Sequence, residues 1–498
     1  MNVDFDVIVI GSGAAGGTMA SALAQSGRRT LLLERGSPQH PSEQRDEQST
    51  LIEKRPYDSR EIVLNDRPSR LYMGSGPGGG TSVYGAALMR PATDDFHPGK
   101  HYSKRLPKHL WDWPIRYEDL EDWFDVAERL YRVPGCHHDN PLPLNPVRGV
   151  PDNDPLPLIP VNERIVHRCR EAELNPFRLP LGIESDQCLR CANCAGFLCP
   201  TGARRSSAQL VQEALSTQQP LTVIVGQEVS HLVRRPDGTV DGVSVVDLST
   251  KATHVYRGHR YVLAAGAIGS PGILLRSGFD HPQIGRNYMM HYSPLVVGVF
   301  AKATCAEDTF SKQLGFADFY YGTHELREKM GIVQSLPVPG LLMLKKSGLG
   351  RVPEFVLRWL RRHMLPFVGI VEDLPNPNNR VECRADGRIS LFHQFSDFDR
   401  ARGAALARAM VRMLKIAGAA QCVRREMPSR DHVAHQCGTA RFGVDSANSV
   451  VDSNCRMFGH ENLFVVDGSI LPTSLGVGPS LTLIANSLRI ADVLKHET

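Results

Sequence analysis

The stretch FDVIVIGSGAAG, residues 5–16, decides the fold of this chain. Its apolar run predicts a buried strand, and the G-x-G-x-x-G turn of Gly11, Gly13 and Gly16 follows it and opens a predicted helix over residues 18–26. Glycine permits the tight turn and a close approach of backbone to a pyrophosphate, which the N–H groups and partial positive charge of the helix N-terminus bind. The stretch therefore predicts an α/β unit that binds a dinucleotide.

A second predicted strand, residues 30–33, ends at Glu34, 18 residues past Gly16. A carboxylate at this place can accept hydrogen bonds from ribose hydroxyls. A glycine turn in an unrelated fold is the alternative, and the order of strand, helix, strand and carboxylate argues against it. The residues expected to contact the cofactor are Gly11, Gly13, Ala14, Ala15, Gly16, Glu34 and Arg35. This turn alone does not separate FAD from NAD.

Composition limits the class of protein. A length of 498 residues suggests about two to four domain-sized units. The hydrophobic share of 42% and the charged share of 22% are typical of a soluble globular protein. A net charge of +4 without a basic block argues against a nucleic-acid partner. No secretion-type start and no apolar run of roughly 18 residues is found, so we expect a cytoplasmic protein.

Five further segments recur in a defined order along nearly the whole chain. They are residues 76–85 (GPGGGTSVYG), 262–278 (beginning VLAAGAIGSP), 284–291 (IGRNYMMH), 435–439 (HQCGT) and 462–482 (beginning NLFVVDGS). Together they resemble the glucose–methanol–choline (GMC) family of FAD-dependent oxidoreductases. The resemblance is specific at both ends of the chain and weak over residues 295–430.

The resemblance implies bound FAD and the oxidation of an alcohol to a carbonyl. Glycines at 78–80 let backbone pass close to a flat ring system, and the helix predicted from Ser480 aims N–H groups at the flavin pyrimidine edge. We expect non-covalent FAD, because residues 76–85 contain no histidine or cysteine. The further cofactor contacts implied are Gly79, Gly80, Thr81, Tyr84, Gly85, Val229, Ala265, Gly266, Asp467, Gly468, Pro479, Ser480 and Leu481.

Alcohol oxidation by a flavin needs a base as well as a hydride acceptor. Histidine suits this role because its unperturbed pKa is about 6.5. His435 matches the catalytic histidine of the family, three residues before Gly438-Thr439. The resemblance therefore implies that His435 takes the hydroxyl proton while a hydride goes to flavin N5.

Gly478 departs from the family pattern. The family places an Asn or His four residues before the threonine that matches Thr482, and glycine has no side chain to bind a substrate hydroxyl. Three interpretations stay open: water or another residue such as Ser474 or Ser480 fills the role, the pocket is enlarged for a bulky substrate, or the site is impaired.

Four cysteines crowd into twelve residues of the chain. The spacing of Cys188, Cys191, Cys194 and Cys199, with Pro200 after the last, suits an iron–sulfur cluster, and four thiolates also suit zinc. A cluster would offer electrons a one-electron exit. Free or disulfide-paired cysteines are the alternative.

A helix is also predicted within residues 353–367. It would place on one face the apolar residues Phe355, Val356, Trp359, Leu360 and Met364, with Arg358, Arg361 and Arg362 largely off it. Such a helix can lie on a membrane surface. A lid over the substrate pocket or a protein interface is the alternative.

The predicted architecture is an α/β fold in two parts. A Rossmann-like FAD-binding domain is assembled from residues 1–100, 200–300 and 436–498. An α+β substrate-binding domain with an antiparallel sheet comes from residues 301–435, and residues 101–199 form a cap and connection that carries the cysteines.

The predicted function is oxidation of a sugar, glycoside or polyol-like alcohol, with a sterol or aliphatic alcohol left open. The electron acceptor is oxygen, a quinone, a dye or a redox protein. Because the cysteines could hold a cluster, we expect a dehydrogenase that turns over faster with an artificial electron acceptor than with oxygen. A lyase with structural FAD and a flavin-binding protein without turnover are the alternatives, the latter motivated by Gly478.

Overall fold

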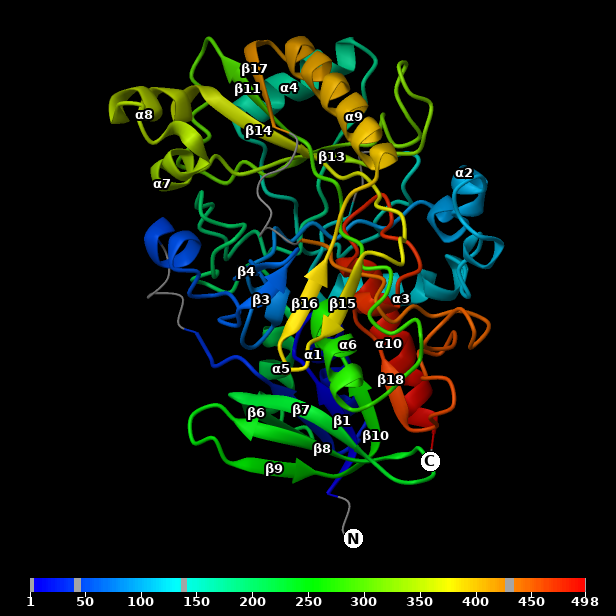
Figure 1. Ribbon diagram of the computed structural model, residues 1–498. Coiled ribbons are helices and arrows are strands. Elements are labelled where there is room, and N and C mark those ends of the chain that lie inside the picture. The colour runs from blue at the N-terminus through cyan, green and yellow to red at the C-terminus, as the bar shows by residue number, and fades with distance from the viewer. Residues whose placement is uncertain (1–3, 40–45, 136–140, 426–433, 498) are drawn as a thin grey trace.

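A five-stranded parallel sheet forms the centre of one half of the molecule. The computed structural model describes residues 4–39, 46–135, 141–425 and 434–497. The strand order is β18-β10-β1-β2-β6, and every neighbouring pair is parallel. These strands are β1 (Phe5–Ile10), β2 (Thr30–Glu34), β6 (Leu221–Val225), β10 (Gly258–Leu263) and β18 (Leu463–Val465). Figure 1 shows them in the lower half, near both ends of the chain.

Helices cover this sheet and bury its apolar strands. Both faces of a parallel sheet are normally covered, which explains why β2 is buried along its whole length. The helices of this half are α1 (Ala14–Gln25), α3 (Glu118–Leu130), α5 (Ser207–Ser216), α6 (Gly266–Arg276) and α10 (Ser480–His496). Helix α1 packs against α10 and α5. A Cβ on Gly16 would lie 2.0 Å from the Gly11 carbonyl oxygen, so this first turn of α1 requires glycine.

A six-stranded antiparallel sheet forms the other half, in the upper part of Figure 1. Its order is β17-β11-β14-β13-β12-β5. The strands are β5 (Pro176–Arg178), β11 (Leu295–Phe300), β12 (Leu314–Phe316), β13 (Val333–Ser335), β14 (Met364–Gly369) and β17 (Ala419–Arg425). Helix α9 (Asp397–Ile416) packs on β11, β14 and β17, and α4 (Pro160–Glu171) contacts α9. This half has its own hydrophobic core.

Two smaller sheets complete the described structure. One is β15-β16-β3-β4 and the other is β7-β8-β9. Their strands are β3 (Ile62–Leu64), β4 (Arg67–Ser69), β7 (Gln227–Arg234), β8 (Val240–Asp247), β9 (Thr253–Tyr256), β15 (Arg380–Cys383) and β16 (Ile389–Phe392). Short helices α2 (Gly99–Tyr102), α7 (Leu341–Leu344) and α8 (Glu354–His363) lie at the surface of the molecule.

The α/β class with a parallel sheet and a separate antiparallel sheet is confirmed. The predicted domain limits stay a prediction, although the sheets cross two of them. Strand β11 precedes the expected boundary at residue 301, and β5 comes from the expected connection at 101–199, yet both pair in the antiparallel sheet. Strand pairing joins segments that sequence distance separates.

The helix predicted within residues 353–367 is shorter than its apolar pattern indicated. Helix α8 ends at His363, and Met364 begins β14, which pairs with β11 and β13. Strand pairing overrides the helical periodicity there, so Met364 is buried in a sheet. Within the described ranges, no helix is both long and apolar enough to cross a bilayer. A cytoplasmic location stays a prediction.

Candidate active site

The carboxyl ends of the parallel strands bring four predicted segments to one edge of the sheet. Strand β1 leads into Gly11, β2 ends at Glu34, β10 leads into Ala265-Gly266, and β18 leads to Asp467. In open α/β sheets, ligands bind outside the carboxyl ends of the strands. The topology therefore places the predicted cofactor residues of all four segments together.

The turn after β1 is shaped by glycine and opens onto free space. Gly11 has φ +103°, and a Cβ there would lie 2.5 Å from the Ala264 carbonyl oxygen. A Cβ on Gly13 would meet no atom within 4 Å. Gly13 is the N-cap of α1 and provides no side-chain cap, so the first N–H groups of the helix, at Ala14 and Ala15, are left for an anion. This cradle fits a diphosphate.

Glu34 holds the turn in place. Its carboxylate accepts hydrogen bonds from Ser12 N (3.1 Å), Ser12 Oγ (2.6 Å) and Gly36 N (2.7 Å). Burial raises the pKa of Glu34, and these hydrogen bonds oppose that rise. The neighbouring Arg35 instead pairs with Asp58 at 2.9 Å and Glu228 at 3.1 Å. Through its ion pair with Glu228, Arg35 thus links the end of β2 to β7.

Residues 76–85 lie directly against the first turn. Gly78 N donates to Ser12 Oγ at 3.1 Å, and a Cβ on Gly79 would lie 3.0 Å from Gly13 Cα. A Cβ on Gly80 would meet nothing within 4 Å. Two predicted contact residues brace this segment: Thr81 Oγ1 donates to the Gly78 carbonyl at 2.6 Å, and Tyr84 OH donates to the Arg205 carbonyl at 2.7 Å.

Lys312 is a buried lysine beside this segment, and sequence reasoning did not single it out. Its Nζ donates to the Gly85 carbonyl oxygen at 3.1 Å. Burial lowers the pKa of Lys312 to about 8. No sequence pattern indicates this contact, because Lys312 and residues 76–85 are far apart in the chain.

Asp467 joins the end of β18 to the start of α6. It accepts from Gly266 N and Ser469 N, both at 2.8 Å, and from Ser270 Oγ at 2.5 Å. Burial raises the pKa of Asp467 against these hydrogen bonds. Gly266 has φ +83° and, like Gly13, would present a Cβ to open space. Gly468 packs closely, since its Cβ would lie 2.4 Å from the Gln436 carbonyl oxygen.

The start of α10 shows an unsatisfied buried group. Pro479 is the N-cap without a side-chain cap, Ser480 is half-buried and Leu481 is buried. The Thr482 hydroxyl is buried and has no hydrogen-bond partner among the described residues. A bound FAD would offer partners to the Thr482 hydroxyl and to the free N–H groups at the start of α10. It would also fill the space beside the glycines at this sheet edge. The residues present therefore fit the cofactor.

Val229 lies apart from this edge on β7. It is buried, and its carbonyl oxygen accepts from Arg276 Nη2 at 3.2 Å. Its pairing partner is Val245 of β8. Strand β7 follows β6, which pairs with β2, so β7 is connected to the parallel sheet on the side of Glu34.

His435 lies against a second histidine. Its Nδ1 is 2.8 Å from His291 Nδ1, with the rings 4.9 Å apart and nearly perpendicular at 85°. His435 is half-buried and has φ +62°, a conformation that L residues rarely adopt. Its Nε2 would lie 3.3 Å from a Cβ on Gly478. The structure thus brings together the predicted base and the position at which the family pattern is broken.

His291 is fully buried and held from its other side. Its Nε2 lies 2.8 Å from the Leu475 carbonyl oxygen. Burial lowers the pKa of His291 to about 4. Sequence reasoning noted His291 only as the end of the segment 284–291. The one signal for its role was its place after Gly285-Arg286-Asn287, which says nothing of a contact with His435.

Ser474 does not replace the missing side chain. Its hydroxyl accepts from Asp373 N at 2.8 Å and donates to the Asp373 carbonyl at 3.0 Å. Both bonds are buried, so Ser474 is committed to joining residues 373 and 474. Asp373 in turn accepts from Met290 N at 3.1 Å and contacts His393 Nε2 at 3.0 Å. Burial raises the pKa of Asp373 to about 6, with His393 opposing.

The predicted iron–sulfur or zinc site is not supported. Cys188, Cys191, Cys194 and Cys199 are free thiols, and the described ranges hold no group of three or more His, Cys, Asp or Glu side chains placed for a metal ion. Arg204 Nη1 lies 3.9 Å from Cys194 Sγ, where its positive charge would repel a cation. Burial raises the pKa of Cys188 and of Cys194, which disfavours these two thiolates. The pKa of Cys199 is lowered instead, because hydrogen bonds from Arg204 and Thr201 outweigh its burial. Only the spacing of the four cysteines along the chain favoured a metal site.

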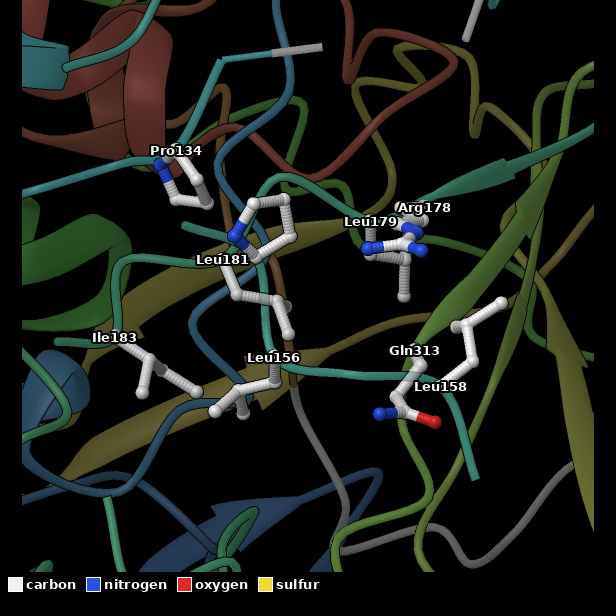
Figure 2. A pocket seen from close by; sticks show the side chains of 9 residues that line it. Pro134, Leu156, Leu158, Arg178, Leu179, Leu181, Ile183 and Gln313 are labelled. Carbon is white, nitrogen blue, oxygen red and sulfur yellow. The ribbon is translucent and has the colours of Figure 1, made fainter. Parts of the chain in front are cut away.

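A small pocket elsewhere has too little volume for a substrate. Figure 2 shows its lining, which is mostly apolar: Pro134, Pro155, Leu156, Leu158, Arg178, Leu179, Leu181, Ile183 and Gln313. Its volume of about 20 Å³ is room for one water molecule. None of the predicted site residues lines it, and we read it as a packing gap.

Comparison with known proteins shows which family models and relatives the chain matches. Residues 5–293 match the N-terminal and residues 375–487 the C-terminal sequence model of GMC oxidoreductase. The chain is 29% identical to 6'''-hydroxyparomomycin C oxidase of Streptomyces lividus, over 97% of this chain and 90% of that protein. It is 28% identical to paromamine 6'-oxidase of Streptomyces fradiae, over 98% and 90%.

The fold matches as well. Pyridoxine 4-oxidase from Mesorbium loti superposes with a TM-score of 0.68 at 19% identity, over 100% of both chains. The resemblance inferred from the six motif segments is therefore confirmed, and the chain is a member of the GMC oxidoreductase family.

Proposed function

We propose that this protein uses FAD to oxidise an alcohol group of a sugar, glycoside or polyol-like substrate to a carbonyl, with His435 as the base. The observation that carries the proposal is the position of His435. Its Nε2 faces Gly478, and Gly478 directly precedes the N-terminus of α10, where the buried Thr482 hydroxyl lacks a partner. The base thus lies beside the helix start that fits the flavin.

The chemistry divides between cofactor and chain. When bound, FAD would supply the two-electron oxidant that accepts a hydride. His435 Nε2 takes the hydroxyl proton, so that the C–H and O–H bonds break as the C=O bond forms. The chain also positions this base. A base held within hydrogen-bond reach of the hydroxyl raises the reaction rate by about 10²–10⁴-fold.

The substrate class is supported by the relatives. The two proteins that match over nearly the whole chain are named as oxidases of 6'''-hydroxyparomomycin C and of paromamine. Gly478 supports a bulky substrate, because the space beside His435 Nε2 contains no side chain from position 478. We therefore propose a glycoside hydroxyl, bound at the opening that Gly478 leaves.

Oxygen is the acceptor that we propose. An exit through a metal cluster loses its basis, because Arg204 lies among the cysteines and the described residues hold no metal-binding group. Both of the relatives named above are oxidases. Stoichiometric hydrogen peroxide from turnover in air supports oxygen, whereas faster turnover with a quinone or dye contradicts it.

Anaerobic addition of a panel of sugars and glycosides tests the activity. Bleaching of the visible flavin band together with carbonyl formation is the expected result. Product without bleaching would favour a lyase with structural FAD, and no response across the panel would favour a flavin-binding protein without turnover. Either of these two outcomes contradicts the proposal.

A further inference from the structure

The hydrogen bonds of His291 assign the protons on both histidines. Leu475 offers a carbonyl oxygen, which only accepts, so His291 Nε2 at 2.8 Å must donate. A neutral imidazole carries one proton, so His291 Nδ1 is an acceptor. The 2.8 Å contact between the two Nδ1 atoms then requires a proton on His435 Nδ1. In neutral His435 the lone pair is therefore on Nε2, the atom that faces Gly478.

The surroundings of His291 keep it neutral. Burial is the main influence and lowers its pKa to about 4. Lys329 acts in the same direction, while Glu372 and the carbonyl of Leu475 oppose. Lys329 is itself paired with Asp95 at 2.6 Å and with Glu372, so these carboxylates offset its positive charge. Neutral His291 can act as an acceptor across the ordinary pH range.

We propose that His291 is a positioning residue that holds His435 as the Nδ1-protonated tautomer, so that Nε2 begins each turnover as a base. This proposal deepens the proposed oxidation and rests on it. The contact also restrains a ring whose backbone has φ +62°. When His435 becomes protonated, its Nδ1–H still donates to His291 and the cation keeps a partner.

Two variants of His291 separate this role from packing. His291→Leu keeps bulk and removes the acceptor, whereas His291→Asn can place Oδ1 near the Nδ1 position. We expect His291→Leu to lower the rate of flavin reduction by about 10²-fold with little change in KM, and His291→Asn to recover about tenfold or more of that loss. The acidic limb of the pH–rate profile, where His435 loses its proton and becomes a base, should move in His291→Leu. Equal losses in the two variants, or unchanged pH profiles, would overturn the proposal.

Nitrogen NMR of the ring nitrogens in the intact flavoprotein gives a readout that does not need turnover. The His435 resonances are identified by their loss in His435→Gln. Wild-type protein should show a protonated Nδ1 on His435, and His291→Leu should shift that proton towards Nε2. A protonated Nε2 in the wild type would overturn the assignment even if alcohol oxidation is found. The expected tautomer without any oxidation would contradict only the proposed function.

A second, independent feature is an exposed apolar surface with a basic rim. Helices α7 and α8 lie at the outer side of the half that contains the antiparallel sheet, away from the parallel sheet (Figure 1). The exposed fractions are 38% for Leu342, 75% for Phe355, 37% for Val356 and 54% for Trp359. We call these four residues the α7–α8 surface. Leu357 is fully buried and fixes the rotation of α8, so this surface faces outward and is not a lid over the site.

Most of the charges beside the α7–α8 surface are positive, although the Glu47 carboxylate lies against α7 and accepts from Leu342 N at 2.9 Å. Residues 341–363 contain six Lys or Arg and one acidic residue, Glu354, which pairs with Arg358 at 2.7 Å. The cations are Lys345, Lys346, Arg351, Arg358, Arg361 and Arg362. The Trp359 ring stacks on the His363 ring with 4.5 Å between the ring centroids, and Trp359 is about half exposed to solvent. Aromatic side chains on one helix with basic residues beside them are typical of interfacial helices.

We infer that the α7–α8 surface docks on an anionic lipid bilayer. Phe355 and Trp359 would enter the boundary between headgroups and acyl chains, and the arginines would lie among the phosphates. Charge favours this partner, since the six cations outnumber the two nearby carboxylates, Glu47 and Glu354, and attract a negatively charged leaflet. A helix of ten residues can lie on the bilayer but cannot span it.

Co-sedimentation of the flavoprotein with vesicles tests this inference. Binding to phosphatidylglycerol-containing vesicles should exceed binding to pure phosphatidylcholine at least tenfold and should fall with salt. The double variant Phe355→Ser/Trp359→Ser should lose about tenfold of the binding. Val444→Ser, at an equally apolar residue that is 82% exposed elsewhere, should bind as the wild type does. Binding that is absent, or equal in all three proteins, would overturn the inference and leave a protein partner as the alternative.

Discussion

His435 Nε2 lies 3.3 Å from the point at which a side chain on Gly478 would begin. The nitrogen that takes the proton in the proposed reaction thus faces a position with no side chain. Any residue larger than glycine at 478 would touch the base directly. The absence of a side chain at this position therefore decides what can approach His435.

We expect Gly478→Asn to narrow the range of substrates. The new amide would contact His435 Nε2 and occupy the space that a bulky glycoside needs. Turnover of a large glycoside should fall at least tenfold, while small alcohols should keep or gain activity. Rates of flavin reduction for a graded series of alcohols measure this. Identical substrate profiles for the two proteins would mean that Gly478 does not face the substrate.

His435→Ala should lower the rate of flavin reduction by about 10² or more, because the hydroxyl proton loses its acceptor. FAD should stay bound, since the glycine cradle, Asp467 and the start of α10 are unchanged. Stopped-flow reduction under anaerobic conditions and the ratio of flavin to protein absorbance check the two parts. A variant that is reduced as fast as the wild type would remove His435 from the mechanism.

The purified protein should be yellow with about one FAD per chain, and acid precipitation should release all of it. The reason is that the site offers hydrogen bonds and open glycines, and residues 76–85 provide no histidine or cysteine for a covalent link. Absorbance of the supernatant after precipitation measures the released fraction. Colour that stays in the pellet would contradict non-covalent binding.

Gly13→Ala should abolish tight FAD binding while the fold is kept. Gly13 has φ −63° and ψ −170°, which alanine adopts readily, and its Cβ would meet no protein atom within 4 Å. The methyl group would instead occupy the cradle at the start of α1. Gly350→Ala, at an exposed position far from the cradle in the sequence, is the matched control. Normal FAD content in Gly13→Ala with an unchanged circular dichroism spectrum would contradict the role of the Gly13 turn in binding FAD.

Lys312→Met should change how stability depends on pH. Burial lowers the pKa of Lys312 from its ordinary value of 10.5 to about 8. Between these values the unfolded chain binds more protons than the folded one, so this lysine makes stability rise with pH across that window. The full difference is about 3 kcal/mol, and Lys312→Met should lose the rise. Urea unfolding from pH 7 to 10.5 measures it, with the exposed Lys302→Met as control. Parallel curves for Lys312→Met and wild type would contradict the role of burial.

Much of the fold could be predicted because its signals are local. The turn at Gly11 to Gly16 requires positive φ and close packing from its own residues, and β1, α1 and β2 follow within 30 residues of the chain. The meeting of Glu34, Gly266 and Asp467 at one edge then follows from parallel strand order. The family itself was recognisable from six segments, each read without knowledge of its neighbours in space.

Which distant side chains touch depends on tertiary packing. His291 and His435 are 144 residues apart, and their shared hydrogen bond exists because β-pairing and burial bring residues 289–291 against residues 435–437. Arg204 beside Cys194, Ser474 bound to Asp373 and the ending of α8 at β14 are further outcomes of packing. Spacing along a chain encodes local backbone conformation. The protonation of a base and the binding of a metal depend on burial and on neighbours from other segments, and these arise only when the segments fold together.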